Sequence, residues 1–196
     1  RDVYQDKNYT IKIATEIDPY SQATSKKEIF SDSVKFIKEN QEHVNYWVSE
    51  KDNGIYHAMN KGIEVAKGDY CLFLNSGDEF FDKDVVSKIY KNIYTEDILV
   101  FDSILFENCE TKTNHPEKMT LSYLWNDTIC HQSALIKTDL LLKFKYDESL
   151  KIVSDWKLFI LLFVKYNCTF RKINQIITVH YLDGISADPK NFQLIK

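Results

Sequence analysis

Residues 49–81 read S-E-K-D-N-G-I-Y-H-A-M-N-K-G-I-E-V-A-K-G-D-Y-C-L-F-L-N-S-G-D-E-F-F and carry the strongest structural signal in the chain. Four apolar residues in the first half recur at near-helical spacing and predict a helix. They are Ile55, Met59, Ile63 and Ala66. Gly68 stands where a glycine at the C′ position would end that helix, so we expect a new element to begin directly after it.

The second half of this stretch predicts a strand followed by a binding turn. Residues 71–74 form an unbroken apolar run without a solvent-facing side, which is typical of a strand covered on both faces in a parallel or mixed sheet. The run ends in the polar turn Asn75-Ser76-Gly77-Asp78, which carries a carboxylate. Because ligands of open α/β sheets bind beyond the carboxyl ends of the strands, this turn is the first candidate binding site.

Residues 50–62 and 68–78 together resemble the bacterial family 2 glycosyltransferases, which often read S-E-x-D-x-G-I-Y-D-A-M-N-K-G, then G-D, then F-L-N-S-G-D. The match is long and nearly gapless, so it is far more specific than a single short motif. The resemblance implies an α/β protein with the GT-A fold, in which helices flank a central mixed, mostly parallel sheet. It also implies one domain over residues 1–196, with a donor half at about 1–106 and an acceptor half at about 107–196.

The composition is that of an ordinary globular protein, with 44% hydrophobic and 28% charged residues among 196. This length suits a single domain with a sizeable core. The formal charge of −4 disfavours a nucleic-acid partner, because phosphate binding needs a basic surface. The aromatic content of 14% suits either a pocket that stacks a base or a sugar, or simply the core.

Cysteine spacing and hydropathy indicate a cytoplasmic protein. The four cysteines are scattered without metal-ligand spacing, so we expect them to be reduced core residues. No apolar run approaches the roughly 18 to 20 residues that a membrane-spanning helix needs. If the acceptor is lipid-linked, we also expect peripheral association with the inner face of the membrane.

The region before residue 49 supplies a further candidate carboxylate. Residues 9–18 alternate between apolar and polar and end at Asp18-Pro19, which predicts a strand followed by a turn. The resemblance implies that Asp18 contacts the nucleotide base, whereas a plain turn aspartate is the alternative. It also implies an earlier strand and base-binding loop, which nothing before Tyr9 supplies. We expect either that an N-terminal segment is missing from this sequence or that the donor pocket is degraded, and we favour the first.

Apolar periodicity predicts alternating helices and strands along the rest of the chain. Helices are expected at 27–39, 82–94 and 138–144 and from residue 154, and strands at 44–48, 98–101, 104–106, 129–136, 169–173 and 176–181. Residues 107–118 are polar and contain Pro116, so they predict a loop or hairpin tip where acceptor specificity can reside.

The resemblance implies that the segment from Asp52 to Gly62 lies along a nucleotide-sugar donor, either a UDP-sugar or a GDP-sugar. The N-terminus of the helix in this segment would offer free N–H groups and a positive dipole end to the diphosphate. The implied donor contacts are Asp52, Asn53, Gly54, Asn60, Lys61, Asn75, Ser76 and Gly77. Asp52 and Asn53 are also ordinary helix-capping residues, which is their structural alternative.

Two carboxylates divide the expected chemistry. Divalent ions such as Mn²⁺ or Mg²⁺ prefer carboxylate oxygens, so Asp78 is the expected ligand of an ion that neutralises the departing diphosphate. Residues 154–159, S-D-W-K-L-F, resemble the family's E/S-D-x-x-L-x-x-R/K motif. This resemblance implies that Asp155 is the general base of an inverting single displacement. A plain N-cap is the alternative for Asp155.

The acceptor side is expected at a histidine and glutamine pair and at the start of the last helix. The resemblance implies that His131, Gln132 and Trp156 lie near a carbohydrate or a lipid-linked saccharide acceptor. A hydrogen-bonded strand histidine without a role in binding is the alternative for His131. His180, which precedes a G-I-S segment at 184–186, would assist the metal or the diphosphate.

Three functions therefore compete. The first is inverting transfer of a sugar from a nucleotide-diphosphate sugar to an acceptor hydroxyl in bacterial surface polysaccharide synthesis. The second is a non-catalytic nucleotide-sugar-binding subunit of the same fold. The third is a nucleotidyltransferase, which would normally show a glycine-rich basic phosphate loop near its N-terminus, and this sequence shows none there.

Overall fold

The computed structural model describes residues 12–14, 34–75, 77–92, 94–106, 110–181 and 190–191. The strands are β1 (Lys12–Ala14), β2 (Tyr46–Val48), β3 (Tyr70–Cys71), β4 (Glu79–Phe80), β5 (Ile98–Phe106), β6 (Glu110–Lys112), β7 (Ala134–Lys137) and β8 (Phe170–Tyr181). The α-helices are α2 (Ile55–Glu64), α3 (Val85–Tyr90), α4 (Leu121–Asn126), α5 (Thr138–Phe144) and α6 (Ser154–Ile160), and residues 34–39 are also helical. Two 3₁₀ turns, η1 (Gln41–His43) and η2 (His131–Ser133), and a π-helical turn, η3 (Leu161–Lys165), complete the elements.

The described strands form one six-stranded sheet and a separate parallel pair, β1 with β2. The larger sheet has the order β3-β7-β5-β8-β4, and β6 pairs with β5 outside this path. β5 and β8 run parallel, whereas the pairs β3–β7, β5–β7, β4–β8 and β5–β6 are antiparallel. The sheet is mixed, as expected, but the expectation of mostly parallel pairing is wrong for these strands. The reason is that β7 runs against both β3 and β5, so two strands of one direction are separated by a reversed one.

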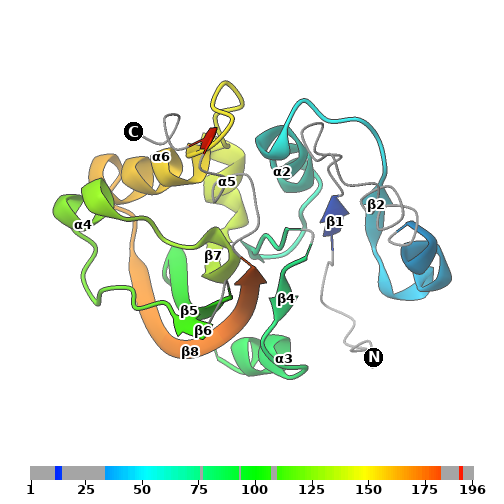
Figure 1. The fold of residues 1–196 in the computed structure, drawn as a ribbon, viewed down its shortest axis with the longest axis horizontal. Coiled ribbons are helices and arrows are strands. Elements are labelled where there is room, and N and C mark those ends of the chain that lie inside the picture. Colours follow the sequence, from blue (N-terminus) through cyan, green and yellow to red (C-terminus); the bar gives the residue numbers. More distant parts are fainter. Residues whose placement is uncertain are drawn as a thin grey trace.

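Alternate side chains of β5 enter two separate apolar layers. Ile98 and Val100 join the larger core, which α2, α4, α5 and α6 complete. Leu99 and Phe101 join the smaller core, which includes Val85 of α3. Figure 1 shows α2, α5 and α6 above the sheet and α3 below it. The domain therefore has a helix, sheet and helix layering, with the larger core on the side of α2 and α6.

The apolar run after α2 is covered on both faces, as its composition predicts. Phe73 packs against the larger core and Leu72 against the smaller one. The hydrogen-bonded strand is shorter than expected, because only Tyr70 and Cys71 pair with β7. β3 stands at one end of the described sheet order. The run therefore leaves the ladder early and continues as irregular chain to Asn75.

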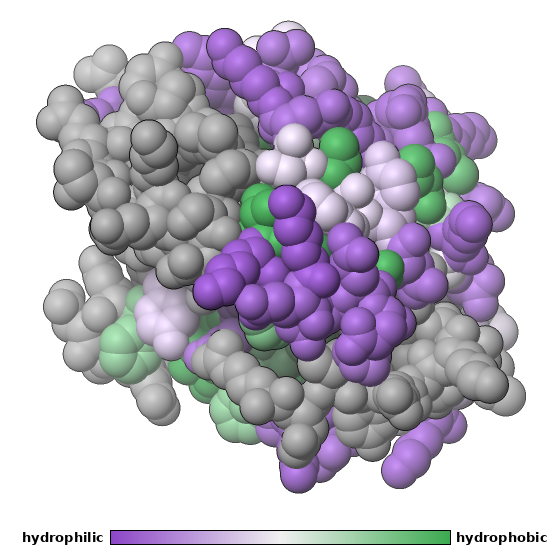
Figure 2. Space-filling view, turned by 90° about the vertical axis from the view of Figure 1, so that its right-hand side faces the viewer, coloured by the Kyte–Doolittle hydropathy of each residue, from purple (hydrophilic) through white to green (hydrophobic). Residues whose placement is uncertain are grey.

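Within the described residues, no helix is long and apolar enough to cross a membrane. The face of the molecule drawn in Figure 2 shows mainly hydrophilic side chains among its coloured residues, with small apolar areas between them. The largest fully buried side chains of the described residues all lie in the two cores.

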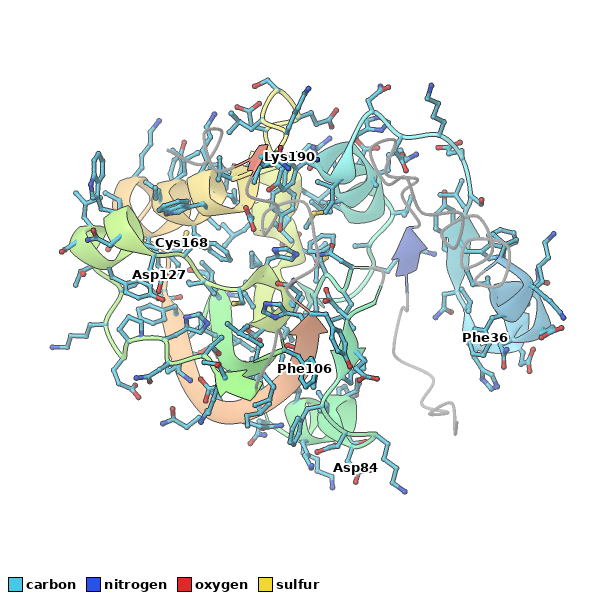
Figure 3. The ribbon with its side chains drawn as sticks, in the orientation of Figure 1. Phe36, Asp84, Phe106, Asp127, Cys168 and Lys190 are labelled. Atoms are coloured by element: carbon cyan, nitrogen blue, oxygen red, sulfur yellow. The ribbon has the colours of Figure 1, made fainter. Side chains whose placement is uncertain are left out.

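One helix was not expected from the sequence. Helix α4 begins after Thr120, whose hydroxyl accepts a hydrogen bond from the backbone N–H of Tyr123 at 3.1 Å, and ends before Asp127. Figure 3 shows Asp127 on the side of the molecule opposite Phe36, which belongs to the helix at 34–39. A Thr N-cap was the available sequence signal, but the following turn is too short to show apolar periodicity.

Several expected boundaries differ from those in the structure. Helix α2 ends at Glu64, so Gly68 is not its C′ residue, and the carbonyl of Gly68 instead accepts a hydrogen bond from Thr138 Oγ1. The expected strands at 169–173 and 176–181 are one strand, β8. The expected helix at 27–39 and the expected strand at 9–18 fall only partly within the described residues.

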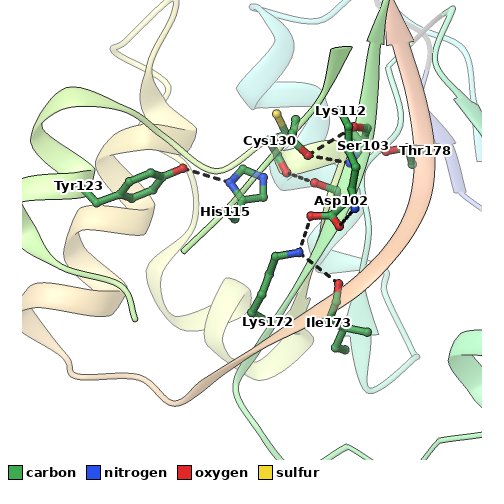
Figure 4. Close-up of polar contacts among 11 residues, drawn as sticks. Asp102, Ser103, Lys112, His115, Tyr123, Cys130, Lys172, Ile173 and Thr178 are labelled. Atoms are coloured by element: carbon green, nitrogen blue, oxygen red, sulfur yellow. Dashed lines mark hydrogen bonds and ion pairs between the residues drawn. The ribbon is translucent and has the colours of Figure 1, made fainter. Parts of the chain in front are cut away.

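A buried ion pair lies where β5 and β8 change register. Asp102 is 1% exposed and accepts a hydrogen bond from Nζ of Lys172, whose side chain is equally buried. Lys112 of β6 approaches the other carboxylate oxygen at 2.9 Å. Beside them the hydroxyls of Ser103 and Thr178 share a hydrogen bond of 2.9 Å (Figure 4). The register shifts on both sides of Asp102 make room for these polar groups within the sheet.

Candidate active site

A chain of hydrogen bonds joins four segments that are distant in sequence. Asn75 Nδ2 lies 3.0 Å from Nε2 of His131, and Nδ1 of His131 lies 2.9 Å from Oδ2 of Asp155. The hydroxyl of Tyr56 donates to Oδ1 of the same carboxylate at 3.0 Å. The four side chains come from α2, the turn after β3, η2 and the start of α6.

The turn that carries Asn75 is closed by its own polar groups. The N–H of Asp78 donates to the carbonyl of Asn75 at 3.1 Å, and Oδ2 of Asp78 accepts from the N–H of Asn75 at 3.0 Å. Gly77 has a φ of 99°, which a residue with a Cβ rarely adopts. The turn therefore fixes the Asp78 carboxylate close to the Asn75 amide that contacts His131.

His131 stands in a 3₁₀ turn and not in the strand where the sequence placed it. The turn is held by Ser133, whose N–H and hydroxyl both donate to the carbonyl of Cys130 at 3.0 and 3.1 Å. Strand β7 begins only at Ala134. The expected strand over 129–136 is thus wrong in its first half, because the His131 side chain bonds to Asn75 and Asp155 outside the ladder.

Asp155 occupies the first turn of α6 with a side chain that is 17% exposed. Its Oδ1 accepts from the backbone N–H of Trp156 at 2.9 Å as well as from Tyr56. The preceding Val153 has a φ of 68°, a left-handed conformation that costs a β-branched residue about 1–3 kcal/mol. The Asp155 carboxylate itself is oriented by its bonds to Tyr56, Trp156 and His131.

The electrostatics of the site favour an ionised Asp155. Burial alone would raise the pKa of Asp155, but hydrogen bonds and charge from His131, with donors from Trp156 and Tyr56, lower it below the ordinary value. Burial and the adjacent Asp155 carboxylate raise the pKa of Tyr56, so its hydroxyl keeps its proton and remains a donor. Burial raises the pKa of the Cys130 thiol to about 12, with further contributions from three carboxylates that include those of Asp155 and Asp78.

His180 lies near His131 and is buried in β8. Burial, followed by the charge of His131, lowers the pKa of His180 to about 4, so this imidazole is neutral at neutral pH. Its Nδ1 has no hydrogen-bond partner among the described residues. His180 is thus a neutral group beside His131, and its expected assistance to a metal or diphosphate stays a prediction.

Two of the expected donor contacts form a local network at the start of α2. The Asp52 carboxylate is 4% exposed and contacts Nδ1 of His57 at 3.2 Å and the ammonium of Lys61. Lys61 also contacts Glu50 at 2.5 Å. The two carboxylates therefore hold the Lys61 ammonium beside the segment that leads into α2, and contact between Lys61 and a donor stays a prediction.

The helix itself starts differently from the expected capping. Gly54 is the N-cap residue, with a φ of 124° and no side-chain cap, so Asp52 and Asn53 do not cap α2. The N–H of Asn53 instead donates to Nδ1 of His57 at 3.2 Å. The positive φ at Gly54 favours glycine at this position.

Asn60 has a structural environment. It is 5% exposed, and its amide donates to the carbonyl of Tyr146 at 2.9 Å and to Glu148 at 2.8 Å. Its oxygen accepts from the N–H of Tyr146 at 2.9 Å. These bonds tie α2 to the segment before α6. They thereby support the Tyr56 ring, which stacks on Tyr146 at 5.4 Å between ring centroids.

The acceptor-side residues are only partly gathered. Gln132 follows His131 in η2 and is half-buried. The backbone N–H of Trp156 donates to the Asp155 carboxylate, but its indole N–H donates to the carbonyl of Leu124 on α4 at 2.5 Å. The Trp156 side chain also lines an open, mainly apolar hollow of about 240 Å³ together with Leu150, Val153, Lys157, Ile160 and Leu161. By helical spacing this hollow lies on the face of α6 away from Asp155.

The part of the chain that the structure describes contains no group of three or more His, Cys, Asp or Glu side chains placed to hold a metal ion. Asp78 places one carboxylate at the turn. That single carboxylate fits Mg²⁺ or Mn²⁺ when phosphate oxygens and water complete the ion's shell. The residues therefore fit an ion that is bound together with a diphosphate rather than a preformed metal centre.

Two expected donor residues, Asp18 and Ser76, lie outside the described residues. In contrast, Tyr56 was not singled out from the sequence, although it supplies a hydrogen bond to Asp155. The available signal was a tyrosine on the buried face of a helix, because a buried tyrosine hydroxyl generally needs a polar partner. Which partner it finds depends on a residue 99 positions away.

Comparison with known proteins finds similar sequences. A family model, Glycosyl transferase family 2, matches residues 27–154, which is more than half of the chain. An uncharacterized glycosyltransferase of Mycobacterium tuberculosis (strain CDC 1551 / Oshkosh) is 54% identical over 43 residues, covering 22% of this chain and 16% of the relative. A PGL/p-HBAD biosynthesis glycosyltransferase of Mycobacterium bovis (strain BCG / Pasteur 1173P2) is 24% identical over 110 residues, covering 55% of this chain and 43% of the relative. The chain thus spans less than half the length of these curated relatives.

Solved structures show a similar fold. S. aureus TarS 1-349 in complex with UDP superposes with a TM-score of 0.63 at 14% identity, covering 91% of this chain and 52% of TarS 1-349. Its complex with UDP-GlcNAc gives a TM-score of 0.60 at 15% identity, covering 76% of this chain and 46% of that one. At such identity the likeness establishes the shared fold, while ligand and activity require separate argument.

Proposed function

The chain belongs to glycosyl transferase family 2 and has the GT-A fold, and on that premise we propose that it transfers a sugar from a nucleotide-diphosphate sugar to an acceptor hydroxyl with inversion. The observation that supports this is the hydrogen-bonded path from Asp78 through Asn75 and His131 to Asp155. A single displacement needs leaving-group stabilisation and proton removal within one constellation. This path brings side chains that can serve both tasks into one such constellation.

We assign the donor diphosphate to the turn that carries Asp78. Asp78 would hold a divalent ion, which supplies charge neutralisation for the departing nucleoside diphosphate when it is bound. The turn positions this carboxylate through its hydrogen bonds with Asn75. UDP is the first nucleotide to test, because the solved TarS complexes contain UDP and UDP-GlcNAc.

We assign proton removal to the Asp155 side of the site. Asp155 is ionised, and its three hydrogen-bond donors hold the carboxylate in one orientation. The acceptor hydroxyl would approach from this side, opposite the bond that breaks, as inversion requires. The acceptor is a carbohydrate hydroxyl, either free or on a lipid-linked saccharide.

The proposal is tested by donor binding and donor turnover in the same preparation. Thermal shift with UDP-GlcNAc, UDP-glucose and GDP-mannose, each with and without Mn²⁺, should identify a donor. A ligand at about 100 times its Kd stabilises the folded state by about 2.7 kcal/mol. Release of free nucleoside diphosphate from that donor then measures slow transfer to water.

Asp78→Asn should abolish the Mn²⁺-dependent part of the shift. The matched control is Asp84→Asn, which changes an aspartate before α3 on the other side of the sheet. If none of the three donors raises the melting temperature, the proposed function is contradicted.

A second candidate function is a nucleotide-sugar-binding subunit without turnover. The observation that favours it is the single carboxylate at the turn, since Asn75 and Gly77 stand beside Asp78 where acidic ligands are possible. The same experiment separates the two functions. Donor binding without any release of nucleoside diphosphate supports the binding subunit and contradicts transfer.

A further inference from the structure

Both oxygens of the Asp155 carboxylate are already engaged within the protein. Oδ1 accepts two hydrogen bonds, from the Tyr56 hydroxyl and the Trp156 N–H, and Oδ2 accepts one from His131. The pKa of Asp155 is lowered by these groups, so the carboxylate is a weaker base than a free aspartate. General-base catalysis works best when the pKa of the base lies near the operating pH, and these bonds move Asp155 away from that range.

His131 has the opposite arrangement. An ionised carboxylate can only accept hydrogen bonds, so the contact between Asp155 and Nδ1 places the imidazole proton on Nδ1. Nε2 is then the basic nitrogen of the neutral ring, and it accepts from the Asn75 amide. A histidine held in this tautomer by an aspartate is oriented to take a proton at Nε2 and to be stabilised as imidazolium.

We propose that Nε2 of His131 takes the proton of the acceptor hydroxyl, and that Asp155 acts as a positioning residue through Nδ1. The hydroxyl replaces the Asn75 amide on Nε2, its O–H bond breaks, and the electron pair of that bond forms the new bond to the anomeric carbon. The bond from the anomeric carbon to the diphosphate breaks, and its electrons leave with the nucleoside diphosphate. The proton stays on His131 beside the Asp155 carboxylate. This inference rests on the proposed function.

The titratable groups around His131 suit this role. Asp155 faces it from α6 as an anion, and His180 lies near it from β8 as a neutral imidazole, since its pKa is about 4. Cys130 precedes it as a neutral thiol with a pKa of about 12, and the Asp78 carboxylate lies beyond Asn75. The proton that His131 takes would therefore add a positive charge next to one anion, with no cation among these groups.

The decisive variant is His131→Asn, because an asparagine amide can still donate to Asp155 from the position of Nδ1 but has no basic nitrogen. We expect nucleoside diphosphate release from UDP-GlcNAc with Mn²⁺ to fall about 10²- to 10⁴-fold. The thermal shift produced by the same donor should be unchanged. His115→Asn is the matched control, because it changes a buried histidine whose Nδ1 contacts Tyr123 at 3.0 Å, outside this site. A His131→Asn rate close to that of the wild type overturns the proposal.

Chemical rescue separates the two candidate bases. Added imidazole should restore release in His131→Ala, and added formate should fail to restore it in Asp155→Ala, because formate cannot reproduce an oriented histidine. Rescue of Asp155→Ala by formate without rescue of His131→Ala by imidazole overturns the inference while leaving the proposed function intact.

A measurement without substrate distinguishes failure of the inference from failure of the function. In ¹⁵N spectra of the histidine side chains, neutral His131 should carry its proton on Nδ1, and Asp155→Asn should change that tautomer. A proton on Nε2 in the wild type overturns the inference even if transfer is observed. If the wild-type protein binds UDP-GlcNAc and releases no nucleoside diphosphate from it, the proposed function fails for that donor whatever the tautomer, and the inference fails with it.

Discussion

The protein buries two aspartates in different ways. Asp102 in β5 has a side chain that is 2% exposed and pairs with two lysines, one of which, Lys172, is equally buried. Asp155 in α6 is 17% exposed and is held by a hydroxyl, a backbone N–H and the imidazole of His131. Lysines are permanent cations at neutral pH, whereas an imidazole can gain and lose a proton. The comparison teaches that the charge of Asp102 is balanced by permanent cations, whereas the charge of Asp155 faces a group that can exchange a proton.

The two carboxylates also differ in where they lie in the fold. Asp102 lies between register shifts inside the sheet, where neighbouring strands cover it. Asp155 follows the left-handed Val153 at the start of a helix, beside the turn that carries Asn75. A rigid ion pair within a sheet and a carboxylate at the junction of four segments should therefore respond differently to substitution.

The largest expected effect is the loss of turnover caused by Asp155→Asn. Nucleoside diphosphate release should fall about 10²- to 10⁴-fold, because an amide neither holds the His131 tautomer nor stabilises its imidazolium. Donor binding, followed by thermal shift, should survive. Asp147→Asn, an exposed aspartate on the segment before α6, is the control and should keep the wild-type rate. Near-normal turnover of Asp155→Asn would remove the distinction between the two buried aspartates.

The next effect is on stability, from Asp102→Asn. The free energy of unfolding should fall by about 3–5 kcal/mol, because the buried ammonium of Lys172 loses its carboxylate. Urea denaturation measures this loss. Lys112→Ala removes the exposed partner of the same carboxylate and should cost only about 0–1 kcal/mol. Equal losses of unfolding free energy in the two variants would show that pairing with the buried Lys172 does not explain the contribution of Asp102 to stability.

A smaller effect is expected from Tyr56→Phe, which removes one donor from Asp155 while keeping the ring that stacks on Tyr146. The free energy of unfolding should fall by about 1.5–3 kcal/mol, the usual range for a hydrogen bond to a charged group. The pKa of Asp155 should rise, because the Tyr56 bond is one of the groups that lower it. Urea denaturation measures the loss of unfolding free energy, and a carboxyl titration by ¹³C NMR measures the pKa of Asp155. An unchanged Asp155 pKa would contradict the expected rise.

The smallest effect concerns pH and the exposed Asp147. Lys157, followed by Ser149, lowers the pKa of Asp147 from 3.8 to about 2. A carboxyl with a lowered pKa stabilises the fold above its unfolded pKa, and this contribution disappears as the pH falls through the folded pKa. The difference in melting temperature between wild type and Asp147→Asn should therefore be full at pH 5, much smaller near pH 2 and absent below it. A difference at pH 2 as large as that at pH 5 would assign it to something other than the charge.

Local pattern was sufficient for much of the fold. The 3.6-residue spacing from Ile55 onward predicts α2, and the continuous apolar run at 98–101 predicts the buried first part of β5. It was not sufficient where long-range pairing decides the outcome. β3 is cut short because only Tyr70 and Cys71 meet β7, and His131 leaves the expected strand because its partners are Asn75 and Asp155.

The sequence by itself determined the family, the apolar runs that fill the two cores, and the turn carrying Asp78, because these depend on residues close together along the chain. Tertiary structure alone decided that Asp155 is enclosed by Tyr56 and His131, and that Asp102 is paired with Lys172. The physical reason is that a buried polar group needs a partner, and that partner comes from whichever segment packing brings within about 3 Å. The spacing of residues along the chain does not predict which distant residue becomes that partner.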